Sequence, residues 1–154
     1  MFLTVHATVG AIIGENIQIS WLSFIIGILF HYFFDLIPHG DEKLNKLMPF
    51  KSLTARVFFF FVVDFLSILL LFSYLFTYTD FINLSPQVFW AIVGSVLPDF
   101  LWGFHQLTKI KLLQQYRKID LKIHAILQNP IGIKQGMVVQ YLLELLLIAI
   151  VINY

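Results

Sequence analysis

The stretch HYFFDLIPHGD, residues 31–41, places two histidines and two aspartates at the end of an otherwise apolar run. Ionisable side chains inside a membrane span are costly unless they are paired, hydrated or bound to a ligand. His31 and Asp35 are four positions apart, so they share one face of a helix. Such a pair can chelate one ion through an imidazole nitrogen and a carboxylate oxygen. It can equally form a contact within itself, and this alternative stays open.

The end of the same stretch predicts a sharp turn. Pro38 cannot continue a helix, and Gly40 allows the backbone to fold back. We expect this turn to bring His39 and Asp41 over the face that carries the first His–Asp pair. The alternative is that both residues belong to an ordinary loop at the membrane surface.

The composition indicates a membrane protein. Of the 154 residues, 59% are apolar and only 12% are charged, and the mean hydropathy is +0.85. Soluble domains are about 25% charged. The chain contains no cysteine, which excludes disulfides, thiolate metal sites and cysteine nucleophiles. Any metal site must therefore use nitrogen and oxygen ligands.

The apolar segments predict an all-α integral membrane bundle that forms a single domain over residues 1–154. A first helix over residues 2–14 is too short to cross the bilayer. The segment between residues 108 and 128 has helical apolar spacing with lysines opposite, which favours an amphipathic surface helix, although part of it alternates like a strand. Four spanning helices are expected, at residues 19–37, 53–78, 86–104 and 137–154.

The basic residues predict the orientation. All ten Lys and Arg residues lie in two regions, and the connection between residues 79 and 85 has none. The positive-inside rule places both basic loops in the cytoplasm and the C-terminus outside. Topology therefore accounts for the basic loops, and we expect no nucleic-acid partner.

Further ionisable residues fall inside the apolar segments, and we expect them to cluster in the inner half of the bilayer. They are His6, Asp64, Asp99 and Glu144. Asp99 follows Pro98, which perturbs a helix. Asp64 can instead pair with Arg56 or His6, and Glu144 can bond a neighbouring helix. Both structural alternatives stay open.

Three motifs in this order resemble a known family. HATVGAIIG (6–14), HYFFDLIPHGD (31–41) and GSVLPDFLWGFH (94–105) are similar to the membrane-bound metal-dependent hydrolases of the bacterial inner membrane. That family is itself similar in motif style to zinc-dependent phospholipase C. The resemblance implies metal ligands at His6, His31, Asp35, His39 and Asp99.

The chain also departs from these relatives. An HRxxTHS-like element after the Pro-Asp pair is replaced by GFHQL (103–107), and a second HxxxE-like pair is missing. The resemblance therefore implies one or two divalent ions, with zinc as the expected metal, rather than a trinuclear site.

Together these features predict a metal-dependent hydrolase in the bacterial cytoplasmic membrane. The expected substrate is a phosphoester or ester, with a lipid of the inner leaflet preferred, and Asp41 or Asp64 is the expected general base. The alternative is a membrane protein without enzymatic activity, whose buried His/Asp cluster serves transport or fixes the helix register.

Overall fold

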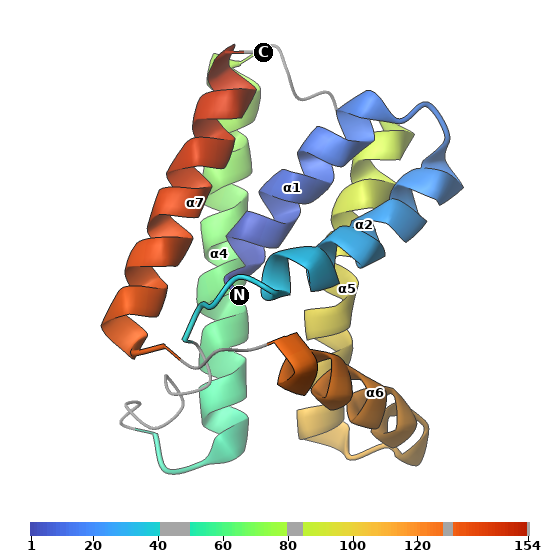
Figure 1. Cartoon of the computed structure of the whole chain (residues 1–154), viewed down its shortest axis with the longest axis vertical. Helices are drawn as coiled ribbons and strands as arrows, with labels where there is room; N and C mark the ends of the chain where they lie inside the picture. The colour runs from blue at the N-terminus through green and yellow to red at the C-terminus, as the bar shows by residue number, and fades with distance from the viewer. Residues whose placement is uncertain (41–49, 80–84, 128–130, 154) are drawn as a thin grey trace.

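The computed structural model describes residues 1–40, 50–79, 85–127 and 131–153, without the side chains of residues 124–127. Over these ranges every element of regular secondary structure is a helix, as predicted (Figure 1). Six helices are described: α1 (Leu3–Asn16), α2 (Ser20–Asp35), α4 (Leu53–Tyr78), α5 (Pro86–Thr108), α6 (Lys111–Leu127) and α7 (Ile133–Asn153).

Three of the described helices, α4, α5 and α7, are long and apolar enough to cross a membrane. This finding indicates an integral membrane protein. α4 has 26 residues, which corresponds to a length of ~39 Å at 1.5 Å per residue. Many of its Phe and Leu side chains are exposed, as expected for a surface that faces lipid rather than water.

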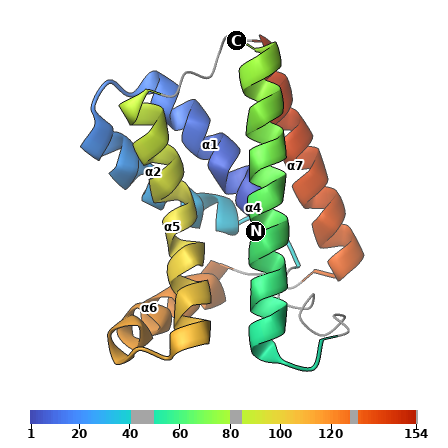
Figure 2. The same ribbon diagram turned by 180° about the vertical axis from the view of Figure 1, so that it is seen from behind.

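The fourth predicted span is not confirmed. α2 is apolar but has only 16 residues, or ~24 Å, which is less than the ~30 Å hydrocarbon core. The apolar run continues to Ile37, but the helix ends at Asp35 because Pro38 follows and disfavours helical geometry in the residue before it. α1 and α2 form a hairpin whose free ends, the N-terminus and the end of α2, lie part-way along α4 (Figures 1 and 2).

α5 is the helix around which the hairpin packs. Its closest neighbours are α1 and α2, and glycines let the backbones approach each other. A Cβ atom at Gly94 of α5 would overlap the carbonyl oxygen of Phe24 in α2, and one at Gly14 of α1 would overlap the backbone of Val88 in α5. The predicted short first helix is therefore packed against its neighbours.

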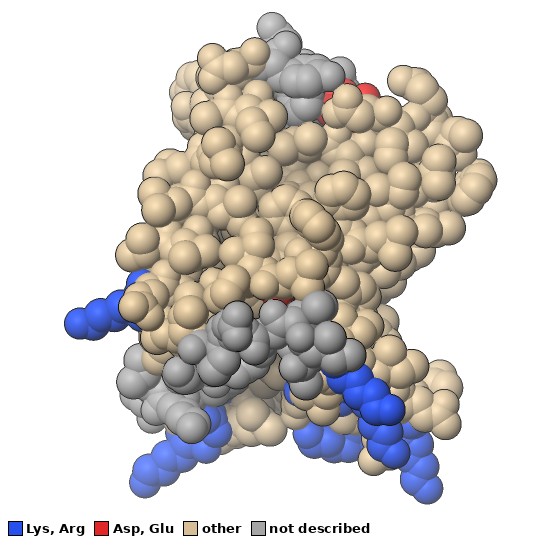
Figure 3. Space-filling view, viewed as in Figure 1, with Lys and Arg blue, Asp and Glu red and all other residues tan. Residues whose placement is uncertain are grey.

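α6 confirms the predicted amphipathic helix, and the strand alternative is wrong. It lies across the end of the molecule where α5 ends and α4 begins (Figure 1). Figure 3 shows that Lys and Arg side chains project from this end, whereas most of the visible face carries no charge. The exposed lysines Lys111, Lys118 and Lys122 belong to α6.

The tight contact at Gly94 can be tested against a glycine of the same helix. Gly94→Ala forces the α2 and α5 backbones apart, and we expect it to destabilise the fold by about 1–3 kcal/mol. Gly103→Ala is the matched control, because its added Cβ would meet only Val57 Cγ1 at 3.9 Å. Thermal unfolding in detergent, followed by circular dichroism, should show a lower Tm for Gly94→Ala only. Equal Tm values for the two variants would contradict the packing described.

Candidate metal centre

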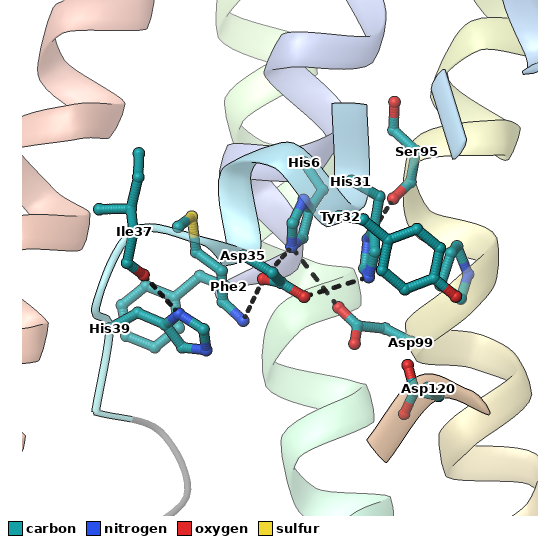
Figure 4. A network of polar contacts seen from close by, with 12 residues as sticks. Phe2, His6, His31, Tyr32, Asp35, Ile37, His39, Ser95, Asp99 and Asp120 are labelled. Atoms are coloured by element: carbon teal, nitrogen blue, oxygen red, sulfur yellow. Dashed lines mark hydrogen bonds and ion pairs between the residues drawn. The ribbon is translucent and has the colours of Figure 1, made fainter. Parts of the chain in front are cut away.

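Three helices bring four of the predicted metal ligands together (Figure 4). His6 lies at the end of the first turn of α1, His31 and Asp35 lie in the last turns of α2, and Asp99 lies in the middle of α5. His6 Nε2 is 3.3 Å from Asp35 Oδ1 and 3.8 Å from Asp99 Oδ2. The convergence joins residues that are far apart in the sequence, and it occurs where the α1–α2 hairpin ends against α5.

The Asp35 carboxylate is the most enclosed acidic group of this cluster, with 3% of its side chain exposed against 31% for Asp99. Its Oδ1 atom lies 3.2 Å from the amino group of Met1. Its Oδ2 atom lies 3.3 Å from His31 Nε2, one helical turn earlier. The predicted stacking of His31 and Asp35 on one face is therefore observed, and both residues also face α1.

The orientation of the His31 ring follows from a backbone contact. Its Nδ1 atom lies 2.8 Å from the carbonyl oxygen of Ser95 in α5. A carbonyl can only accept, so Nδ1 carries the proton and donates it. In the neutral ring, Nε2 then presents a lone pair toward Asp35. This is the arrangement that fixes the tautomer of a metal-ligating histidine.

His6 lacks hydrogen bonds although it is almost fully enclosed. Within the described residues, neither of its ring nitrogens meets hydrogen-bond geometry, and His31 Nε2 does not either. The two imidazole rings stack at a centroid distance of 4.1 Å. Placing a proton charge on both rings at this distance would be costly in a low dielectric. A cation bound by His6 Nε2, His31 Nε2 and the carboxylates would give each ring one partner.

His6, His31 and Asp99 could hold a metal ion, since their ligand atoms all lie within 4.8 Å of one another. A zinc ion with bonds of ~2.0–2.2 Å keeps tetrahedral ligand atoms roughly 3.4 Å apart, so only small movements are needed. The donor set of two imidazoles and one carboxylate suits Zn²⁺. The Asp99 side chain is 31% exposed, which leaves one side of the group open.

The remaining predicted residues lie elsewhere. His39 is buried, but its Nδ1 atom donates to the carbonyl of Ile37 at 2.8 Å, and it is not part of the three-residue group. Asp64 is half-buried on α4 and is not in this group either. Asp41 lies outside the described residues. The roles predicted for Asp41 and Asp64 as general bases stay predictions.

Two polar residues of α7 form hydrogen bonds with α1 and with the chain segments next to the α1–α2 hairpin. Gln140 donates to the His39 carbonyl at 2.9 Å and accepts from the Phe2 backbone amide at 2.6 Å. Glu144 accepts a hydrogen bond from the Thr8 hydroxyl at 2.9 Å, which is the interhelical contact that the sequence left as an alternative. Both residues therefore fix the position of α1 against α7.

The sequence alone did not indicate that α6 contributes polar side chains that contact α5 and α2. The Tyr116 hydroxyl donates to the Pro98 carbonyl at 3.0 Å and lies 3.3 Å from the Tyr32 hydroxyl. Burial raises the pKa of Tyr116, so it remains a donor. Asp120 is buried although it belongs to a surface helix. One signal was present, because Asp120 is the only acidic residue between positions 100 and 143.

Comparison with known proteins gives no family assignment. The chain matches no protein-family model, no curated protein and no solved structure.

The candidate ligands can be tested by metal content. We expect His6→Ala and His31→Ala to weaken Zn²⁺ binding by more than about tenfold, because each removes a ligand nitrogen. Asp35→Asn should weaken it by about tenfold or more, because it removes a carboxylate charge 3.3 Å from both ligand nitrogens. His105→Ala is the matched control, since His105 lies on α5 outside the group. Competition with a zinc-binding dye measures the affinities, and a loss in His105→Ala equal to that in His31→Ala would contradict the assignment.

Proposed function

We propose that the chain is a membrane-embedded, metal-dependent hydrolase that acts on a phosphoester, with a lipid of the inner leaflet as the preferred substrate. The observation that carries the proposal is the group of His6, His31 and Asp99, whose ligand atoms lie within 4.8 Å of one another. The enclosed imidazole nitrogens without hydrogen bonds support a cation there. The resemblance to membrane-bound metal-dependent hydrolases supports the reaction class.

The residues have distinct roles in this proposal. His6, His31 and Asp99 hold one divalent ion, with zinc as the expected metal, and a second ion remains compatible with the carboxylates nearby. When bound, the ion supplies Lewis-acid activation of water and of an ester oxygen. The Ser95 carbonyl fixes the His31 tautomer, and the Asp35 carboxylate lies 3.3 Å from Nε2 of both imidazoles, within reach of the same ion.

The position of the site supports a phosphate-containing substrate. Asp99 is the least buried member of the group, and in Figure 4 it lies between Asp35 at the end of α2 and Asp120 of α6. Exposed lysines surround that end and attract anionic groups. In the proposed orientation this end faces the bacterial cytoplasm, and the C-terminus lies outside.

A second candidate is a buried polar centre without enzymatic activity. The contacts that favour it are those of Asp35, which already has a charged amino group and two imidazoles within 3.3 Å. Such a network can fix helix register or relay a proton without any substrate. It differs from the hydrolase in one outcome, because it turns over no substrate whether or not a metal is bound.

Hydrolysis is the direct test of the proposed reaction. Purified protein loaded with Zn²⁺ is assayed with bis-p-nitrophenyl phosphate and with phosphatidylglycerol in mixed micelles. We expect turnover that His31→Ala reduces by at least about 100-fold, as is common when a group essential to the transition state is removed. His105→Ala should retain it. Stoichiometric zinc without turnover of either substrate would favour the second candidate.

The orientation is tested separately, because the chain has no cysteine. Lys118→Cys on α6 and Gln87→Cys at the start of α5 each introduce one thiol at opposite ends of the molecule. In intact spheroplasts, a membrane-impermeant maleimide should label Gln87→Cys, and should label Lys118→Cys only after lysis. The reverse pattern would place the basic end outside.

A further inference from the structure

Arg117 differs from the other basic residues of α6 in where its side chain lies. Lys111, Lys118 and Lys122 are exposed, whereas the Arg117 side chain is only 21% exposed. Partial burial removes water from the charged guanidinium and costs desolvation free energy, whereas an exposed lysine keeps its hydration. Topology explains the exposed lysines but does not explain why a cation is turned inward.

The contacts of Arg117 connect it to the part of α5 that carries Asp99. Its guanidinium carbon lies 5.2 Å from the ring centroid of Trp102, which is one helical turn after Asp99 on α5. The adjacent Tyr116 donates to the carbonyl of Pro98, the residue before Asp99. Asp120, the ion-pair partner of Arg117, lies directly below Asp99 in Figure 4. The carboxylates of both aspartates act electrostatically on the Tyr116 hydroxyl.

Arg117 is held in place yet keeps donors free for a ligand. Asp120 Oδ2 accepts from its Nη1 atom at 2.9 Å, and the Trp102 ring covers the guanidinium. These contacts fix the plane of the fork but occupy only part of its N–H groups. A planar fork with free donors suits bidentate binding of a phosphate. The Asp120 carboxylate neutralises the charge, so selectivity comes from hydrogen-bond geometry rather than from net charge.

We propose that Arg117 binds the phosphate group of the substrate at the open side of the His6–His31–Asp99 group, with Asp120 and Trp102 as positioning residues. The proposal rests on the proposed function for what happens to the phosphate, but binding itself is measurable without turnover. The phosphate belongs either to a lipid headgroup or to a soluble phosphoester.

The test measures phosphate binding by ³¹P NMR on the full chain in phosphatidylcholine nanodiscs, with and without Zn²⁺. One arm adds inorganic phosphate, and the other incorporates phosphatidic acid. We expect wild type to broaden the added phosphorus signal in at least one arm, and the arm that responds identifies the source. Arg117→Lys, which keeps the charge but loses the fork, should weaken binding by about tenfold or more. Asp120→Asn should weaken it less.

Lys118→Gln is the matched control, since it removes an exposed charge from the next position of α6. Binding within about twofold of wild type is expected for it. A loss equal to that of Arg117→Lys would mean non-specific attraction and would overturn the inference, as would wild type that broadens neither signal. Tm values from circular dichroism show that the variants compared are folded. Arg117-dependent binding without hydrolysis contradicts the proposed function alone, whereas hydrolysis that Arg117→Lys leaves unchanged contradicts only this inference.

Discussion

The buried carboxylate of Asp35 is the constraint on which the centre of the structure depends. Without partners, a buried charge at this position would destabilise the fold by far more than the packing of one short helix stabilises it. Its two oxygens lie within 3.3 Å of the Met1 amino group and of two imidazoles, from His6 and His31. These partners come from α1 and α2, so the carboxylate fixes where both helices end relative to each other. Side chains inside the bundle, rather than water, therefore contact the polar groups at the ends of the hairpin.

Close packing around α5 supports this arrangement. The glycines at the α1–α5 and α2–α5 contacts leave no room for a Cβ atom, and these close contacts fix the position of the hairpin along α5. This position brings Asp99 within 3.8 Å of His6 and the Ser95 carbonyl within 2.8 Å of His31. α6 contacts the same helix at Pro98 and Trp102. One helix thus positions the imidazoles, the half-buried carboxylate of Asp99, and Tyr116 and Arg117 of α6.

Local periodicity made part of the site predictable. The four-residue spacing placed His31 and Asp35 on one face, and the helical spacing of α6 prevailed over its short alternating stretch. The convergence of His6 and Asp99 was expected only from similar depth, because sequence spacing carries no information on which faces of different helices meet. His39 follows Pro38 in irregular backbone, where no periodicity constrains a ring, and it turned to the Ile37 carbonyl instead. The shortness of α2, which has 16 residues, was missed because the apolar run continues to Ile37 although helical geometry does not.

Anomalous scattering at the zinc edge tests the central claim most directly. Crystals of the protein grown with Zn²⁺ should show a peak within bonding distance of His6 Nε2, His31 Nε2 and an Asp99 oxygen, and His31→Ala crystals should lose it. The absence of a peak among these three residues in wild type, with the imidazoles instead bonded only to Asp35, would show that the cluster is a polar core and not a metal centre.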